Sequence, residues 1–444
     1  MSLQFITGNS GNGKTKYLFN RIVKEAKANP RDNYLVIVPE QFTMQTQRQL
    51  VDLSENKAIM NIDVLSFKRL AYRVFDELGI TNLTVLEETG KNLVLRKLAA
   101  QEADKLGIIG RNLNRIGYIS EVKSLLSELV QYNISPEELG RYIASGRLSD
   151  TLSDKLKDVL VLYEAFEKFM QDKYITAEEI LNVLSNVAEE SAILRNSVIA
   201  FDEFTGFTPI QNQLIKKLFV ISKKIYVTLT IDCREDIFKS RGMQELFDMP
   251  KRTVKSLTEM AAFYGIEVEE PIILDKNYRL AENEELSFME QQLFRKRRGS
   301  FKKAPKHIHI DCLRDPKQEL TKIARRINEL VRNENLRYRD IAIVTGDVNI
   351  YAGYVREIFD KYNIPYFIDA TQEILFHPFI EFIRSIPDIA AQNFSADAVF
   401  RFLRCGFSEL LDSEIDVLEN YVLACGVRGK SAVSYTHLTL PTIA

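Results

Sequence analysis

The residues best suited to chemistry lie at the start of the chain, in the stretch Gly8-Asn9-Ser10-Gly11-Asn12-Gly13-Lys14-Thr15. Its spacing, a glycine, four residues and then Gly-Lys-Thr, is that of a phosphate-binding loop (P-loop), and it lies between an apolar run and a helical pattern. Glycine lets backbone N–H groups converge on an anion, and the following helix directs its positive end to the same point. A glycine-rich turn without function is the alternative, but the full pattern with both flanks favours a P-loop.

The motif also predicts a role for each part of the stretch. The residues from Gly8 to Gly13 would surround the phosphates of a nucleoside triphosphate, while Lys14 would reach the β- and γ-phosphates and Thr15 would bind Mg²⁺. The motif indicates nucleotide binding, but it does not indicate what the nucleotide is used for.

A pair of carboxylates, Asp202 and Glu203, directly follows the apolar run 197–201. In a chain that also holds a P-loop, such a pair completes an ATPase site, in which Asp202 would position Mg²⁺ and Glu203 would orient the attacking water. Acidic residues after a strand also cap helices without any catalytic role. The pair therefore predicts catalysis only in combination with the P-loop.

The elements that must position these residues alternate between strands and helices. Apolar runs at 33–38 and 62–65 are bounded by turns, and a helical pattern follows the second run. This alternation predicts an α/β fold with a parallel sheet. Ligands of such sheets bind at the carboxyl ends of the strands, which is where the P-loop, Gln41 and Ser66 would lie.

Further along, helical spacing replaces the strand pattern and strands then return twice. Strands are predicted at 197–201, 224–231, 307–312, 340–344 and 365–368. Helices are predicted at 320–331, at 354–362 and from 378 onward. The predicted domains are a P-loop α/β domain at 1–80 plus 197–282, a helical insertion at 81–196, a second α/β domain at 283–375 and the start of a further helical insertion at 376–432.

Composition limits the class of protein. The chain has 444 residues, of which 45% are hydrophobic and 27% charged, and its formal net charge is -2. We therefore expect several globular domains of ~150 residues rather than a uniformly basic nucleic-acid coat, although the basic run 295–303 is either a solvated linker or a local contact to a nucleic-acid backbone. No apolar run reaches the ~20 residues of a membrane span, and no cationic leader opens the chain, so we expect a cytoplasmic protein without a membrane partner.

The sequence resembles the motor region of the superfamily I (UvrD-like) helicases and, more closely, the amino-terminal part of the AddB/RexB family. Members of that family are the B subunits of bacterial ATP-dependent helicase/deoxyribonucleases. The resemblance runs from Phe5 to about Ser431. Besides the P-loop, it is carried by Val38-Pro39-Glu40-Gln41, Val64-Leu65-Ser66-Phe67, Asp202 to Pro209, Asn277-Tyr278-Arg279, Leu418 to Leu423 and Gly426 to Lys430.

The resemblance implies two RecA-like α/β domains, ATP as the nucleotide and a heterodimer with an AddA-like helicase/nuclease subunit. It implies that Arg279 reaches the γ-phosphate across a domain cleft, whereas the residues alone allow a structural ion pair at that position equally well. By analogy, Gln41, Ser66 and Phe67 would contact DNA. The family acts on single- and double-stranded DNA in double-strand-break repair by recombination.

The sequence also departs from active superfamily I motors. Thr205 and Gly206 stand where those motors carry Gln-Asp, and 231–235 lacks the Gly-Asp-x-x-Gln signature. We therefore expect a degenerate motor that binds nucleotide without driving translocation. The resemblance to the AddB family implies the same, with a B subunit that scans the strand for the Chi sequence. An active helicase motor and a nucleotide-binding scaffold with no DNA role are the alternatives.

The carboxy-terminal part of the family is expected beyond residue 432. The resemblance places a 5'-3' exonuclease domain and the four cysteines of a 4Fe-4S cluster there, so none of the four cysteines of this chain is carried over as a ligand. The stretch Val433 to Thr442 can be encoded by read-through of a common transposon sequencing adapter, and it continues to the last residue, Ala444. We interpret it as an assembly artefact and exclude it from the fold.

Overall fold

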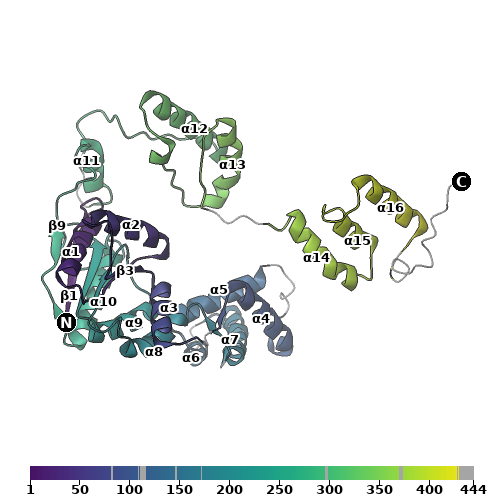
Figure 1. The fold of residues 1–444 in the computed structure, drawn as a ribbon, viewed down its shortest axis with the longest axis horizontal. Coiled ribbons are helices and arrows are strands. Elements are labelled where there is room, and N and C mark those ends of the chain that lie inside the picture. The colour runs from purple at the N-terminus through teal and green to yellow at the C-terminus, as the bar shows by residue number, and fades with distance from the viewer. Residues whose placement is uncertain are drawn as a thin grey trace. The chain divides into compact units, whose positions relative to one another are not determined.

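A sheet of seven strands carries the P-loop at its carboxyl edge (Figure 1). The computed structural model describes residues 1–81, 84–108, 110, 117–145, 148–171, 173–295, 299–369, 374–427 and 429. The strands are β1 (Ser2–Gly8), β2 (Tyr34–Ile37), β3 (Ile62–Leu65), β6 (Val198–Phe201), β7 (Lys224–Thr230), β8 (Glu267–Val268) and β9 (Ile272–Leu274). Their order is β3-β2-β6-β7-β1-β8, β9 also pairs with β1, and all pairings are parallel. The parallel sheet predicted from the alternation of strands and helices is confirmed.

The apolar strands form this sheet because both of its faces are covered. Along β2, Leu35 and Ile37 belong to one hydrophobic cluster, whereas Val36 belongs to the cluster on the opposite face. Helices on both sides supply the rest of these clusters: α1 (Lys14–Ala28) and α2 (Thr43–Leu53) on one face, and α3 (Phe67–Leu78), α9 (Pro209–Ile221) and α10 (Asp248–Phe263) on the other. A near-continuous apolar run is the expected sequence of such a doubly covered parallel strand.

The predicted helical insertion has a hydrophobic core of its own. Its elements are β4 (Val85–Leu86), α4 (Glu88–Gln101), η2 (Ala103–Lys105), α5 (Tyr118–Gln131), α6 (Pro136–Ala144), α7 (Asp150–Met170), β5 (Ile175–Thr176), α8 (Ile180–Val187) and η4 (Ala188–Glu190). Val159, Leu162 and Phe166 of α7 are buried in that core, and their helical spacing places them on one face of the helix. The last helix, α8, instead packs in the core of the sheet domain, through Ile180 and Leu184.

The chain divides into two compact units, Met1–His309 and Ile310–Ala444. The first unit ends with α11 (Glu284–Gln292), whereas the second contains α12 (Pro316–Asn333), η5 (Tyr338–Asp340), α13 (Val348–Lys361), α14 (Pro378–Ala391), α15 (Ala396–Leu403) and α16 (Asp412–Cys425). Helices α12 and α13 share a small core around Leu320, Ala324 and Phe359. The helices predicted in this part of the chain are therefore formed, and the domain boundaries given above stay a prediction.

The three strands predicted for the second α/β domain are a correction. The stretches 307–312, 340–344 and 365–368 form no strand among its described residues. Apolar side chains in these stretches remain exposed, including Ile310 at 94%, Val344 at 93% and Phe367 at 89%. An apolar, β-branched run becomes a strand only when its backbone groups find a neighbouring strand, and the described part of this domain offers none. The second sheet predicted for this chain is thus absent from its described residues, while the α/β class holds through the first sheet.

Candidate nucleotide-binding site

The P-loop lies between the end of β1 at Gly8 and the start of α1 at Lys14. Gly11 has a φ of 89° and Gly13 a φ of 79°, both in the left-handed region that residues with a side chain rarely adopt. A Cβ atom on Gly11 would also lie 2.8 Å from Oδ1 of Asn277. Backbone conformation and close packing therefore both require glycine at this position.

The side chain of Lys14 folds back over the loop. Its Nζ donates hydrogen bonds to the carbonyl oxygens of Gly8, at 3.1 Å, and Asn9, at 3.0 Å. Burial lowers the pKa of Lys14, and the nearby carboxylates of Glu203 and Asp202 oppose that shift. The ammonium group is thus held by two neutral oxygens, which the oxygens of a phosphate can replace as partners.

The acidic pair lies next to the P-loop, although it is far away in the sequence. The hydroxyl of Thr15 is 3.4 Å from Oδ1 of Asp202 and 3.3 Å from Oε1 of Glu203, across 187 and 188 positions of sequence. Thr228 of β7 donates a further hydrogen bond to Oδ1 of Asp202. Because β6 and β7 are neighbours and β7 pairs with β1, the sheet order itself brings the pair to the loop.

Asp202 is almost completely buried, at 1% exposure. Burial raises its pKa, while the hydrogen bonds from Thr228 and Thr15 oppose that rise. Its Oδ2 atom is buried and has no hydrogen-bond partner among the described residues. A buried carboxylate oxygen without a partner is unfavourable, and a cation at this point would satisfy it.

These atoms suit Mg²⁺. The hydroxyl of Thr15 and the carboxylate of Asp202 supply hard oxygen donors, which this ion prefers, and the two side chains are in contact at the start of α1. Two protein oxygens are also a typical number for Mg²⁺, which takes its other ligands from water and phosphate. The residues present therefore fit a Mg²⁺-nucleotide complex.

Glu203 adopts an unusual backbone conformation. Its φ of 64° lies in the left-handed region, and its side chain is exposed, in contrast to that of Asp202. Such a conformation costs roughly 1–2 kcal/mol for a residue with a Cβ, and in native structures it gathers at functional sites. The left-handed backbone at Glu203 directs its carboxylate outward beside Thr15, while the carboxylate of the adjacent Asp202 is buried.

A distant segment of the same unit covers the outer side of the P-loop. Asn277 Nδ2 donates to the carbonyl oxygen of Ser10 at 2.8 Å, and the backbone N–H of Tyr278 donates to that of Gly11 at 3.0 Å. Asn12 of the loop donates in turn to the carbonyl oxygen of Leu274 at the end of β9. The residues after β9 therefore form one wall of the site.

Arg279 is part of this wall. Its backbone N–H lies 3.4 Å from the carbonyl oxygen of Gly11, and its positive charge helps to lower the pKa of Lys14, although burial contributes more. Both residues belong to the first compact unit. The short strand β9 joins the P-loop sheet and brings Arg279 to the loop within this unit, as the predicted domain bounds imply, while its approach to a γ-phosphate stays a prediction.

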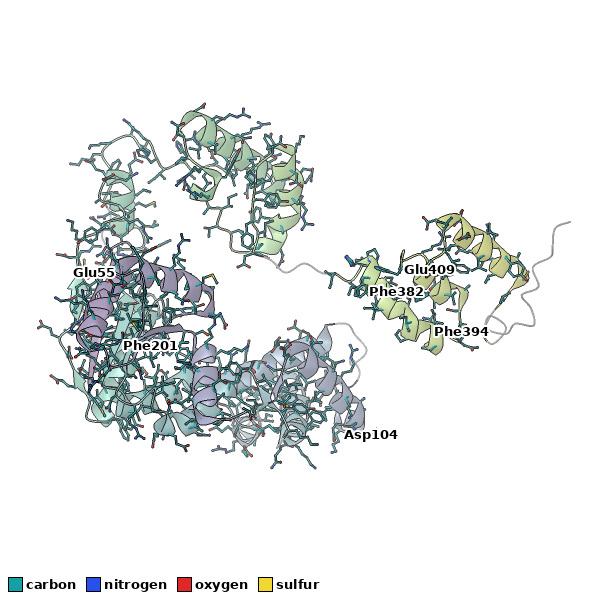
Figure 2. The ribbon with its side chains drawn as sticks, viewed as in Figure 1. Glu55, Asp104, Phe201, Phe382, Phe394 and Glu409 are labelled. Carbon is teal, nitrogen blue, oxygen red and sulfur yellow. The ribbon has the colours of Figure 1, made fainter. Side chains whose placement is uncertain are left out.

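The three residues expected to contact DNA lie at the carboxyl ends of β2 and β3 but differ in access. Gln41 is exposed in the short turn η1 (Glu40–Phe42). The hydroxyl of Ser66 caps α3 by accepting from the backbone N–H of Arg69. Phe67 is buried, with its ring centroid 5.8 Å from that of Phe201 in the interior of the unit (Figure 2). Of the three side chains, only that of Gln41 is free to reach a ligand in this conformation.

Several residues of the site were missed in the sequence. Thr228 lies inside an apolar strand, and Asn9, although placed in the P-loop, gave no sign of its side-chain partners, Glu290 on α11 and the backbone N–H of Cys233 after β7. The basic run 295–303 was interpreted as a solvated linker or a contact to a nucleic-acid backbone. Its first residue, Arg295, does neither here, because it forms ion pairs with Asp232 and Glu290. Residues 296–298 of that run, and the stretch 433–444 interpreted as an artefact, lie outside the described residues.

Other features of the described residues add no second site. No group of three or more His, Cys, Asp or Glu side chains that could hold a metal ion is found among them, and the four cysteines are free thiols. Within the same ranges, no helix is both long enough and apolar enough to span a membrane.

A P-loop after the first strand and an acidic pair after a neighbouring strand, on a parallel sheet covered by helices on both faces, define a P-loop protein of the RecA-like α/β class. The family model described as "ADDB, N-terminal" matches residues 5–290, more than half of the chain. The chain therefore belongs to the AddB amino-terminal family, as the resemblance predicted.

Curated relatives agree with this assignment. The chain is 39% identical over 435 residues to the B subunit of the ATP-dependent helicase/deoxyribonuclease of Lachnoclostridium phytofermentans, and 34% identical over 439 residues to that of Clostridium tetani. Each match covers 97% of this chain but only 38% of the relative. The chain thus spans less than two thirds of the length of the relatives it matches.

Proposed function

We propose that this chain is the nucleotide-binding amino-terminal part of the B subunit of an ATP-dependent helicase/deoxyribonuclease. The observation that carries the proposal is the contact of Thr15 with Asp202, whose second carboxylate oxygen is buried without a partner among the described residues. This pair lies beside the ammonium group of Lys14 at a glycine-rich loop, and ATP with Mg²⁺ is the ligand that such an arrangement fits. The names of the relatives, which state ATP dependence, support the same ligand.

Each residue of the site then has a task. Lys14 exchanges the carbonyl oxygens of Gly8 and Asn9 for phosphate oxygens, and Thr15 and Asp202 hold the metal ion. Glu203 orients a water molecule, while Arg279 adds positive charge at the rim of the loop. Mg²⁺, when bound, neutralises charge on the phosphate oxygens.

We propose further that this motor is degenerate. Thr205 and Gly206 provide no side-chain amide or carboxylate after the acidic pair. After β7, Asp232 is held in ion pairs with Arg234 and Arg295, where an active motor is expected to carry its coupling signature. Nucleotide binding would then regulate the subunit while its AddA-like partner unwinds DNA and this subunit scans for Chi.

DNA would run along the carboxyl edge of the first sheet. Gln41, Lys68 and Arg69 are exposed there, at the ends of β2 and β3. Contacts of this kind are mainly to the phosphate backbone and fall steeply with salt. In this proposal the complete protein acts on single- and double-stranded DNA in the cytoplasm during recombinational repair, and the 5'-3' exonuclease and its 4Fe-4S cluster belong to the longer relatives' remaining length.

The test replaces Lys14 by Ala in the assembled full-length heterodimer. A degenerate motor predicts that unwinding of a duplex persists, whereas binding of a fluorescent ATP analogue to the isolated 444-residue chain falls by at least tenfold. Loss of unwinding would instead favour the alternative of an active motor. Unchanged analogue binding would contradict the nucleotide site itself.

The remaining alternative, a scaffold without a DNA role, predicts a different result in a binding assay. Filter binding of a single-stranded oligonucleotide to the chain across a salt series should give an affinity that falls linearly in a double-logarithmic plot. Absence of binding at the lowest salt concentration would favour the scaffold.

A further inference from the structure

Four side chains connect the P-loop to α11. Asn9 Nδ2 donates to Oε1 of Glu290 at 2.7 Å, and the same carboxylate oxygen lies 3.4 Å from Nη2 of Arg295. Arg295 Nε donates to Oδ2 of Asp232 at 2.9 Å. We call Asn9, Glu290, Arg295 and Asp232 the Asn9 network.

The network is buried and tightly held. Asn9 and Asp232 are both buried, and the side chain of Arg295 is only 10% exposed. The guanidinium of Arg295 also lies 4.7 Å from the centroid of the Phe247 ring, a cation–π contact. Burial disfavours the charge of Asp232, but hydrogen bonds from Arg234 and Arg295 outweigh it and keep the pKa of Asp232 well below its ordinary value. Asp232 and Arg295 therefore stay an ion pair at neutral pH.

Asn9 is fixed at both ends of its amide. Its Oδ1 accepts from the backbone N–H of Cys233, just after β7, at 2.9 Å, while its Nδ2 is held by Glu290. The carbonyl oxygen of the same residue is a partner of Lys14. One residue thus links the cation expected to bind phosphate to a helix far along the chain, since Asn9 and Glu290 are 281 positions apart.

We propose that Glu290 is a positioning residue for nucleotide phosphate and that the Asn9 network connects occupancy of the P-loop to α11. The inference rests on the proposed nucleotide binding. When the ammonium group of Lys14 leaves the carbonyl oxygen of Asn9 for a phosphate, Asn9 loses one of its partners. Its hydrogen bonds with Glu290 and with the N–H of Cys233 then keep Asn9 from moving into the space that the phosphate occupies. Nucleotide that holds Asn9 more firmly in this place also restrains Glu290 and α11 through their hydrogen bond. Helix α11 is the last helix before the second unit begins, so it is a suitable element to report the state of the site.

The experiment measures binding of Mg²⁺-ATPγS to the 444-residue chain by calorimetry and amide hydrogen exchange along 284–295 with and without that nucleotide. Glu290→Ala removes the acceptor for Asn9 and is expected to weaken affinity roughly tenfold, the effect of losing one charge-assisted hydrogen bond. Glu290→Gln keeps an acceptor oxygen and should recover most of that loss. In the wild type, nucleotide should slow exchange in α11, and in Glu290→Ala it should not.

The matched control is Glu284→Ala on the same helix, which removes an exposed ion pair with Lys303 and should leave affinity and exchange unchanged. Equal affinities for wild type, Glu290→Ala and Glu290→Gln would overturn the inference. Equal hydrogen exchange in α11 of the wild type with and without nucleotide would also overturn it. Neither result affects the proposed function. A wild type that binds no nucleotide would overturn both. If Glu290→Ala does not fold, Arg295→Met leaves Glu290 in place without its orienting cation, and wild-type affinity in that variant would also count against the inference.

Discussion

The carboxylate of Glu203 lies 3.3 Å from the hydroxyl of Thr15, and this contact is made from a backbone with a φ of 64°. The preceding residue, Asp202, approaches the same hydroxyl from the buried side. Left-handed backbone at Glu203 is what allows two consecutive carboxylates to face one threonine. We therefore expect the carboxylate of Glu203 to be placed for the nucleotide site at a cost in the free energy of unfolding.

Replacing Glu203 by Asn tests that cost. Asn tolerates the left-handed region better than Glu, so the free energy of unfolding should rise by roughly 0.5–1 kcal/mol. Glu203→Gln keeps the strain and should leave stability unchanged, while both variants lose any ATP turnover. Chemical denaturation of the wild type, Glu203→Asn and Glu203→Gln measures their free energies of unfolding. If Glu203→Gln is as stable as Glu203→Asn, relief of backbone strain does not explain the stability of the Asn variant.

Asp202 gives a pH-dependent prediction. Because burial raises its folded-state pKa above the ordinary value of 3.8, the folded chain binds more protons than the unfolded chain between the two pKa values. The carboxyl therefore contributes most to stability below the unfolded-state value, and that contribution is lost as the pH rises through the folded-state pKa. Asp202→Asn should melt about 2–4 °C higher than the wild type at pH 7 without Mg²⁺, and the gain should shrink as the pH is lowered. Asp154→Asn, at an exposed ion pair, should show no such trend.

Two glycines with similar backbone angles separate strain from packing. Gly79 has a φ of 69° with nothing within 4 Å of an added Cβ, so Gly79→Ala should cost only the left-handed penalty of about 1 kcal/mol. Gly11→Ala has the same penalty and also brings its Cβ within 2.9 Å of Cβ of Arg279. We expect it to displace the wall at 277–279, to destabilise the chain by at least about 1 kcal/mol more than Gly79→Ala, and to weaken nucleotide binding. Thermal melts and ATP-analogue titrations of both variants compare these effects.

Two of the residues expected to contact DNA, Phe67 and Gln41, differ in side-chain burial, and substitutions should therefore affect them differently. Phe67→Ala removes a ring from an aromatic cluster with Phe201, Phe204 and Phe207, and it should destabilise the first unit by about 3–5 kcal/mol. Gln41→Ala should leave stability within about 0.5 kcal/mol of the wild type and weaken binding of single-stranded DNA. Filter binding of single-stranded DNA at fixed salt, together with chemical denaturation, shows for each variant whether DNA binding or stability has changed. A stable Phe67→Ala with weakened DNA binding would show that this ring becomes accessible.

A buried lysine holds the helical insertion together. Lys91 is 2% exposed, and its Nζ lies 2.8 Å from Glu88 and 2.7 Å from Glu178. Lys91→Met leaves the mostly buried carboxylate of Glu178 without its cation, so the insertion should lose about 3 kcal/mol of stability. Lys157→Met, at an exposed pair on α7, should change stability by less than about 0.5 kcal/mol. Hydrogen exchange of α4 and α7 reports the loss locally.

Much of the first sheet followed from the sequence, and the reason is physical. β2, β6 and β7 are apolar runs covered on both faces, and β1 with its P-loop carries a motif of fixed spacing. The strands β8 and β9, of two and three residues, are too short to show any periodicity. The wall of the site that follows β9 depends on contacts between distant positions, such as that of Asn277 with Ser10 across 267 residues, which no local pattern encodes.

The misplaced expectations have related causes. The stretches 307–312, 340–344 and 365–368 have the residues of strands but find no pairing partner in the described part of the chain, and composition cannot supply one. Phe67 follows a strand at a ligand-binding edge, yet an aromatic residue at the start of a helix has the same sequence pattern whether it faces solvent or the core.

The wall around the P-loop has a consequence for how the chain is made. The ribosome releases Gly8 to Thr15 first, but the residues that enclose them, such as Asn277, emerge 267 positions after the Ser10 that they contact. Until β7 has left the exit tunnel, β1 also lacks its principal neighbour in the sheet. Synthesis from the amino terminus therefore cannot yield a finished phosphate cradle early, and the P-loop, although translated before β7 and Asn277, is among the last parts of its unit to become structured.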